Sequence, residues 1–211
     1  MRVFVVLVCC AAVLGCKKER PAPKAPAISP AEVKLEGTYH AVQCGPVTAV
    51  WSGDPEMLAQ QAPNAPKSFG AESLAFRFFD GSTEGFAPTG QLFFSDWTFD
   101  IFSPDCSLVA LQVDHFGPIH VVPVDQLRAY LDGRFKPVAV QAPGGKESLV
   151  HGQLRWLSPS QFEFVASCCG GAQAFHANTK DGSLERLLDA PTAPNGVRRG
   201  ANGWEVVSEP K

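Results

Sequence analysis

The chain lacks any apolar run long enough to cross a lipid bilayer as a helix. Its longest run, Val3–Leu14, has 12 residues, whereas a hydrocarbon core of ~30 Å needs about 20. Helical spacing of apolar residues is also scarce, and only the short segments Pro55–Gln61 and Asp125–Leu131 show it. Basic residues are few, because the chain from Leu35 onward has 12 Lys and Arg against 19 Asp and Glu, a net charge of −7. We therefore expect neither a helical bundle nor a nucleic-acid-binding protein, which would need a basic surface.

The sequence motifs of metal and catalytic sites are absent as well. No two cysteines have the C-x-x-C spacing of zinc or thioredoxin-like sites. His120 and His176 fall near equivalent strand positions, but no H-x-H or H-E-x-x-H spacing accompanies them, and Gly144-Gly145-Lys146 does not fit the phosphate-loop frame. We therefore predict no metal, no cofactor and no catalytic residue. One alternative stays open, because Asp96 and Asp100 have the strand spacing that places two carboxylates on one face for acid–base work.

The first residues combine one positive charge, the apolar run and a cysteine. Arg2 precedes the run, and Gly15 and Cys16 follow it, which is the order of a secretory leader. The segment Val13–Cys16, VLGC, resembles the lipobox of bacterial lipoproteins. The resemblance implies that residues 1–15 are a signal peptide, that cleavage occurs just before Cys16, and that the acylated Cys16 becomes the mature N-terminus. Three acyl chains would hold the protein at a membrane far more firmly than one.

Residues 16–34 form the predicted lipid anchor and tether. Lys17–Lys34 is rich in Pro, Ala and Lys and has almost nothing to bury, so it favours extended conformations and acts as a semi-rigid spacer. Its net charge of +3 suits a position beside anionic headgroups or simply aids solubility. Lys17 rather than Asp follows the cysteine, and in the lipoproteins that the leader resembles this implies the outer membrane. We therefore expect a lipid-anchored protein of the bacterial cell envelope, facing the periplasm or the cell surface.

Residues 35–211 are predicted to form a single β-rich domain. From Leu35 onward, short apolar runs alternate with Gly, Pro, Asp and Asn. Several runs show the period-two alternation of half-buried strands, as in Leu108–Val113, and they are rich in Val, Phe and Trp. We therefore predict an all-β body made of antiparallel sheets of the meander or propeller-like kind.

The body also contains a recurring pattern of strand, turn and strand. Ser103-Pro104 matches Ser158-Pro159 at an offset of 55, and Gly117 matches Gly171 at 54. A third set matches at an offset of 57 and pairs Leu127, Leu131 and Asp132 with Leu184, Leu188 and Asp189. A fainter copy, TYHAVQCGPVTAVW, begins at Thr38. We predict two to three repeated units, with room for a fourth, near residues 36–63, 97–133 and 152–191.

One unit, FSPDCSLVALQVDHFGPIHVVPVDQLRAYLDG from Phe102 onward, resembles a blade of TolB-type or WD-related β-propellers. Those repeats run Phe/Trp-Ser-Pro-Asp-Gly, an apolar strand, a turn ending in Gly, and further strands. Cys106 stands where the family has Gly, and Ser160-Gln161 replaces Asp-Gly in the next unit. The resemblance implies an incomplete or small propeller, because propellers typically close with four to eight blades. It leaves the function open, since such folds serve binding and catalysis alike.

Four cysteines remain beyond the leader and Cys16, namely Cys44, Cys106, Cys168 and Cys169. An even number in an oxidising compartment permits disulfides, and four cysteines allow three pairings that sequence cannot distinguish. Cys168 and Cys169 lie in FVASCCGGAQAFH, where we expect a hairpin turn whose two glycines supply positive φ. We favour a disulfide from one of these cysteines to Cys44 or Cys106. A bond between the two neighbours, across a distorted peptide, and a redox or metal role are the alternatives.

Aromatic residues crowd between positions 76 and 102, and most of them must belong to the core. In a strand, a pair such as Phe93-Phe94 places one ring on each face, so Phe93, Phe94 and Trp97 are candidates for the lining of a binding groove. We expect a non-enzymatic binding or scaffolding module that attaches to the membrane through its N-terminal lipid and has an envelope protein as its partner. The alternatives are an envelope hydrolase that uses loop carboxylates and a small-ligand carrier with an aromatic-lined groove.

Overall fold

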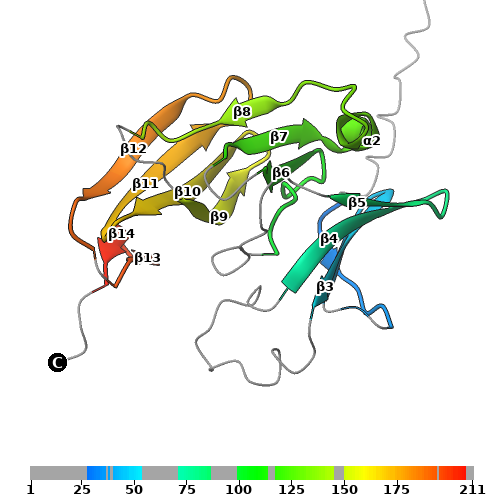
Figure 1. Cartoon of the computed structure of the whole chain (residues 1–211), viewed down its shortest axis with the longest axis horizontal. Helices are drawn as coiled ribbons and strands as arrows, with labels where there is room; N and C mark the ends of the chain where they lie inside the picture. The colour runs from blue at the N-terminus through cyan, green and yellow to red at the C-terminus, as the bar shows by residue number, and fades with distance from the viewer. Residues whose placement is uncertain are drawn as a thin grey trace, which may run out of the picture.

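The described residues of the body are mostly antiparallel strands, which confirms the all-β prediction (Figure 1). Helical structure in the described residues is limited to η2 (Val124–Gln126) and α2 (Leu127–Leu131), at one of the two segments with helical spacing. Within the described part of the chain, no helix is long and apolar enough to cross a membrane. The computed structural model describes residues 28–36, 38, 40–53, 71–86, 99–113, 117–144, 150–193 and 195–207.

Sheet A is a five-stranded meander in which each strand pairs with the next one along the chain. Gly45, with a φ of +59°, lies in the turn between the second and third strands, and Gly81, with a φ of +83°, lies in the last turn. Glycine has no Cβ and adopts this left-handed conformation without a steric penalty. The strands are β1 (Ala31–Glu32), β2 (His40–Cys44), β3 (Val47–Gly53), β4 (Ala71–Phe78) and β5 (Thr83–Phe86).

Sheet B contains β6 (Leu108–Gln112), β7 (Ile119–Pro123) and β8 (Val138–Val140). A stretch before β6 adds to this sheet, since Phe102 forms an antiparallel bridge with Val109. The Ser-Pro-Asp turn that follows Phe102 is closed by the carboxylate of Asp105, which accepts hydrogen bonds from the hydroxyls of two serines at 2.8 and 2.7 Å. Short polar side chains that bond within their own turn are the reason that such sequences leave a strand and reverse.

Sheet C is the longest meander, with the strands in the order β12-β11-β10-β9. Its hairpins are tight, and the two neighbouring strands of the central pair match residue by residue from Gln161↔Asn178 to Cys168↔Gly171. A separate two-stranded sheet D follows at the C-terminal end. The strands are β9 (Val150–Ser158), β10 (Gln161–Cys168), β11 (Gly171–Asn178) and β12 (Leu184–Ala190) in sheet C, with β13 (Val197–Gly200) and β14 (Gly203–Val206) in sheet D.

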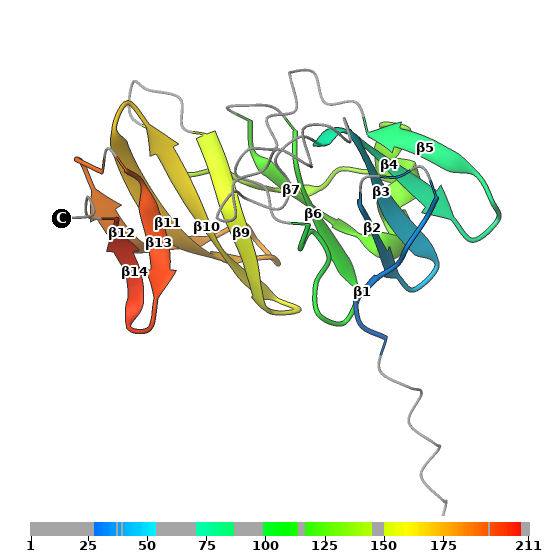
Figure 2. The ribbon, with the colours of Figure 1, turned by 90° about the horizontal axis from the view of Figure 1, so that it is seen from below.

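The sheets stack face to face in the order in which they occur along the chain (Figure 2). Sheet B is the middle layer, and the alternation of β6 shows why. Val109 and Leu111 belong to the core cluster shared with sheet A, whereas Ala110 belongs to the cluster shared with sheet C. Phe162 and Phe164 of sheet C fill the second cluster and are fully buried. Burial of each such ring contributes about 2–3 kcal/mol, so the interfaces between sheets hold the body together.

The described sheets remain separate, and none of them closes on itself. Two of the three sets of matching residues in the predicted repeats fall at equivalent turns. The Ser-Pro pairs precede β6 and β10, and the matching glycines lie in the hairpins that follow. The third predicted match is wrong, because Leu127 and Leu131 lie in α2, whereas Leu184 and Leu188 lie in β12. Both segments have good helix formers, but pairing with β11 makes the second one a strand. The duplication therefore stays a prediction.

A disulfide between Cys44 and Cys106 joins sheet A to the turn that precedes β6. Cys44 is fully buried and Cys106 is 9% exposed. Cys106 has a φ of +59°, so it occupies the left-handed position at which the propeller-like pattern has Gly. A non-glycine residue there costs about 1–2 kcal/mol, and a cross-link between two sheets offsets that penalty. The favoured pairing of Cys44 or Cys106 with the Cys168-Cys169 segment is wrong, because Cys44 and Cys106 are bonded to each other and Cys168 is bonded to Cys169.

Replacing Cys44 and Cys106 together by alanine should lower the free energy of unfolding by about 4 kcal/mol, because the bond spans 62 residues and restricts the unfolded chain. Urea denaturation measures the difference. The matched control is the double change Cys168→Ala and Cys169→Ala, which removes a link across one residue and should lower stability much less. Equal losses in the two double variants would contradict this account.

His151 is a buried histidine between sheets B and C. It lies in β9, is 1% exposed, and its ring centroid is 5.4 Å from that of Phe164. Its Nε2 accepts a hydrogen bond from the backbone N–H of Ala142 at 3.1 Å, so this nitrogen carries no proton. Burial lowers the pKa of His151 to about 4, against a smaller opposite effect of the backbone of Gly117. The folded protein therefore favours the neutral ring.

This burial makes stability depend on pH in a definite direction. His151 has a pKa near 6.5 when unfolded and about 4 when folded, so the unfolded chain takes up the proton first as the solution is acidified. The contribution of His151 to the free energy of unfolding is complete above pH 6.5. It is lost as the pH falls to about 4, a change of about 3 kcal/mol. Urea denaturation across this range measures the change. His151→Gln, which does not titrate, should lose this part of the slope, and an unchanged slope would refute the assignment.

Candidate functional site

The outer face of sheet C, turned away from sheet B, carries a row of charged and titratable side chains. Glu163 in β10 lies directly opposite His176 in β11, and His176 lies directly opposite Glu185 in β12. Directly opposite residues have Cβ atoms about 4.5–5.5 Å apart, so these three side chains are neighbours on one surface. They share this face because the phenylalanines on either side of Glu163 point the other way, into the core.

Sheet D covers one part of the outer face. Small side chains on sheet C allow the hairpin to approach closely, and the resulting cluster contains Val165, Ala172, Ala174, Ala190, Ala193 and Val197, with Leu188 and Trp204 packed against it. Glu163 lies at the border of this cluster and is 5% exposed. Its Oε2 accepts a hydrogen bond from Trp204 Nε1 at 3.1 Å and lies 3.1 Å from Arg199 Nε. The hairpin is therefore fastened to sheet C by one buried charge and its two donors.

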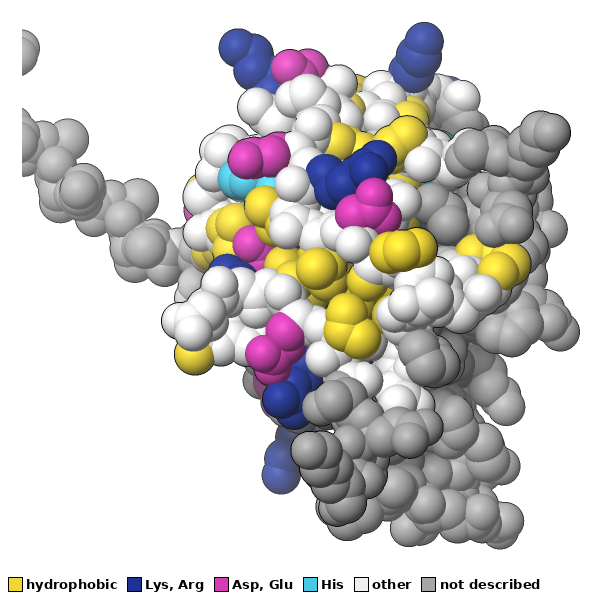
Figure 3. All heavy atoms as spheres, turned by 90° about the vertical axis from the view of Figure 1, so that its left-hand side faces the viewer, with side chains coloured by type: hydrophobic (Ala, Val, Ile, Leu, Met, Phe, Trp, Pro, Cys, Tyr) yellow, Lys and Arg dark blue, Asp and Glu magenta, His cyan; other side chains and the backbone are white. Residues whose placement is uncertain are grey.

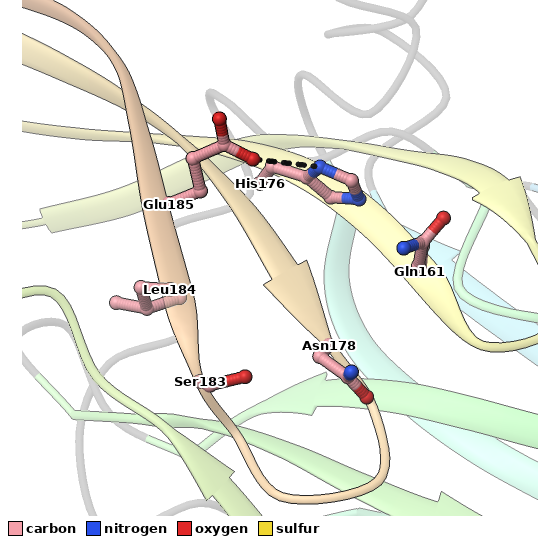
Figure 4. A pocket seen from close by; sticks show the side chains of 6 residues that line it. All are labelled: Gln161, His176, Asn178, Ser183, Leu184 and Glu185. Atoms are coloured by element: carbon pink, nitrogen blue, oxygen red, sulfur yellow. Dashed lines mark ion pairs between the residues drawn. The ribbon is translucent and has the colours of Figure 1, made fainter.

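The remaining part of this face is hollowed. The His176 hollow has a volume of about 210 Å³ and is lined by Gln161, His176, Asn178, Ser183, Leu184 and Glu185 (Figure 4). His176 Nδ1 lies 3.8 Å from Glu185 Oε2, and its Nε2, which is buried, has no hydrogen-bond partner among the described residues. Figure 4 shows that this second nitrogen is on the side of Gln161. Because this nitrogen has almost no exposed surface, a ligand group in the hollow bonds to it only after a neighbouring side chain moves.

Polar groups in the His176 hollow differ in how much of their hydrogen-bonding capacity is already used. Asn178 accepts a bond from the backbone of Lys180, and the Ser183 hydroxyl donates to Asp181, so both hold the β11–β12 turn in place. His176 and Gln161 have the capacity that a ligand would meet. The site therefore suits a compact polar group, such as a hydroxyl or an amide, and its volume of about 210 Å³ is that of about seven water molecules.

Two large apolar side chains are exposed, one in β12, which contributes to the lining of the His176 hollow, and one in β14, which contacts β12. Leu187 of β12 is 40% exposed and Val206 of β14 is 41% exposed, and the space-filling view of this side shows hydrophobic side chains gathered among charged ones (Figure 3). The pairing of β12 with β11 is irregular at Leu187, and Arg186 precedes this residue while Asp189 follows two positions later. Bulges and charges discourage another strand from pairing with a sheet edge, so this surface is suited to contact through side chains.

The second cysteine pair forms a vicinal disulfide at the tip of the β10–β11 hairpin, joining Cys168 to Cys169. The predicted hairpin turn is confirmed. The prediction that both glycines have positive φ is wrong, because the residues with positive φ are Cys169 at +56° and Gly170 at +84°. Gly171 begins β11 and is required for a different reason, since a Cβ there would lie 3.0 Å from the carbonyl oxygen of Pro191.

The histidines considered for a metal site are not brought together. His120 lies on the face of sheet B toward sheet A, where its Nδ1 and the Tyr130 hydroxyl share a hydrogen bond of 2.8 Å. Burial lowers the pKa of His120 and raises the pKa of Tyr130 to about 12. His176 lies in β11 on the outer face of sheet C. In the part of the chain that the structure describes, no group of three His, Cys, Asp or Glu residues is placed to hold a metal ion.

Several predicted site residues lie outside the described residues. They are Cys16, Phe93, Phe94, Asp96 and Trp97. Asp100 is described and exposed. The lipidation site, the aromatic groove and the paired carboxylates therefore stay predictions.

No family model matches the chain, and no curated protein matches it. The site therefore has to be interpreted from its own residues. Sequence reasoning missed Glu163, Arg199 and Trp204, although a signal for the first was present: a glutamate between two phenylalanines marks the polar face of an otherwise apolar strand. Its partners follow 36 and 41 residues later, and no local pattern connects them.

Arg199→Met should lower the free energy of unfolding by about 2 kcal/mol, because it leaves the buried carboxylate of Glu163 with one donor. Thermal or urea denaturation measures this. The matched control is Arg198→Met at the neighbouring residue, whose exposed pair with Glu205 at 2.8 Å should contribute less than about 1 kcal/mol. If the two variants lose the same stability, Glu163 is not the anchor of the hairpin.

Proposed function

We propose that this chain is a lipid-anchored protein of the bacterial envelope whose β-rich body binds a protein partner on the outer face of sheet C. The single observation that carries the proposal is the His176 hollow together with the exposed Leu187 of β12 and Val206 of the contacting strand β14. The hollow is large enough for one polar side chain of a partner, and the apolar residues offer contact area outside it. Interfaces of this kind combine an apolar centre with a few placed polar groups.

A protein partner fits this surface better than a small molecule does. A drug-sized ligand needs a pocket of about 300–1,000 Å³ that encloses most of its surface, and the His176 hollow has about 210 Å³. Leu187 and Val206 belong to β12 and β14 and do not line the hollow. Exposed apolar side chains beside polar groups mark surfaces that contact another protein.

The stacked sheets also support a propeller-like interpretation of the body. Each sheet is an antiparallel meander that packs its face on the next one, which is how propeller blades are arranged. We propose that sheets A, B and C are three units of this kind that do not close into a ring. In such an open stack the last sheet has an outer face that only the sheet D hairpin covers in part, and the proposed binding surface is the remaining part of that face.

The proposed anchor is tested by labelling cells with palmitate. Cys16→Ser should abolish labelling and move the protein from the membrane to the soluble fraction, because the acyl chains are the proposed attachment. The matched control is Cys10→Ser, which changes a leader cysteine outside the VLGC segment and should leave labelling intact. Palmitate labelling of the Cys16→Ser protein would refute Cys16 as the lipidation site.

The proposed binding surface is tested by site-specific photo-crosslinking in cells. A photoreactive residue at Leu187 should give one discrete cross-linked product with an envelope protein, and adding His176→Ala should reduce its yield several-fold. The control position is Thr83, which is exposed on β5 in sheet A and should give no such product. Products from both positions, or from neither, would argue against this surface, and a product of twice the chain mass would show self-association instead.

A further inference from the structure

The tip of the β10–β11 hairpin combines two features that a purely structural turn does not need. Cys169 occupies a left-handed position with a φ of +56°, where Asn, Asp or Gly is preferred in a two-residue hairpin. It is bonded to its neighbour Cys168. A residue that departs from the conformational preference of its turn position often has a functional role.

The two disulfides of the body differ in accessibility. Cys44 is 0% exposed and Cys106 is 9% exposed, inside the cluster between sheets A and B. Cys169 is exposed and Cys168 is half-buried. Thiol–disulfide exchange requires a thiolate to reach a sulfur atom, so access decides which bond reacts first. An incoming thiol therefore meets Cys169 before it meets either sulfur of the inner bond.

Opening the bond at the tip would leave the hairpin in place. The backbone pairing of β10 with β11 continues to Cys168↔Gly171. The turn is also held from outside, because the N–H of Ala193 donates to the carbonyl oxygen of Gly170 at 2.6 Å and Gly171 packs against the backbone of Pro191. A bond between adjacent residues closes almost no loop, so it restricts the unfolded chain little.

We propose that Cys168–Cys169 is a thiol–disulfide exchange site that accepts two electrons from a dithiol. One thiolate of the dithiol attacks Sγ of Cys169, the bond between the two cysteines breaks, and Cys168 leaves as a thiolate that takes up a proton. The second thiol of the reagent then attacks its own sulfur in the mixed disulfide and expels Cys169. The dithiol ends as a disulfide, and Cys168 and Cys169 end as two thiols, so atoms and electrons balance.

The adjacency of the two cysteines decides which reagent succeeds. After the first attack, the thiol of Cys168 stays beside the mixed disulfide at a high effective concentration. With a monothiol, Cys168 expels the reagent and restores the original bond. With a dithiol, the second thiol competes in the same intramolecular manner and completes the reduction. We therefore expect dithiols to reduce the Cys168–Cys169 bond and monothiols to leave it intact.

The first test uses the full-length chain with dithiothreitol as the dithiol. Samples from a titration are alkylated with iodoacetamide and mapped by mass spectrometry. Cys168 and Cys169 should be alkylated at a dithiothreitol concentration about tenfold lower than Cys44 and Cys106. Near-ultraviolet circular dichroism should be unchanged at that point. Alkylation of Cys168 and Cys169 without reductant, or reaction of all four cysteines together, would overturn the proposal, as would loss of tertiary signal.

The second test traps the mixed disulfide. Cys168→Ser leaves Cys169 without its neighbouring thiol, so treatment with oxidised glutathione should leave a glutathione adduct on Cys169. The unchanged protein, first reduced at the tip and then treated in the same way, should show no adduct because Cys168 expels it. Adducts on both proteins, or on neither, would overturn the role of adjacency. Neither test involves the membrane or the His176 hollow, so the proposed function can fail separately.

Discussion

Sheet B has to bury both of its faces, and the arrangement of the body depends on this constraint. The β6 strand has apolar residues on each side, with Val109 toward sheet A and Ala110 toward sheet C. A strand of this kind is stable only between two other layers, because an exposed apolar face would remain in water. Sheets A and C are themselves meanders of adjacent strands, so the chain adds one layer after another.

Because the stack of described sheets does not close, its last sheet, sheet C, has an outer face on which no sheet of similar size packs. The outer face of sheet C is covered in part by the β13–β14 hairpin, which would be marginal as an isolated pair of strands. Alanine side chains bring it close, and Glu163 fastens it through Arg199 and Trp204. The part that the hairpin does not reach is the His176 hollow. The same absence of a further layer explains both features.

The two disulfides contribute to different properties of the molecule. Cys44–Cys106 spans a long separation and joins two layers where the core is already dry, so it acts on stability. Cys168–Cys169 closes almost no loop and lies at an exposed tip, so it adds little to stability and is accessible to thiol reagents. In both cases a cysteine takes a left-handed position, and the positive φ of Cys106 shows that a glycine-like turn can be retained by a residue with a second role.

By itself the sequence determined the all-β class and the Ser-Pro and glycine turns, because these depend on alternation and on side chains that bond within a few residues. It showed only weak helical spacing at Asp125–Leu131, where the short helix α2 forms. It did not determine that LERLLDA, residues 184–190, is a strand, because pairing with β11 overrides helix-forming residues. Only the tertiary structure decided the cysteine pairing and brought Arg199 and Trp204 to Glu163. Those contacts join residues far apart in the chain, and their energy exists only once the layers have packed.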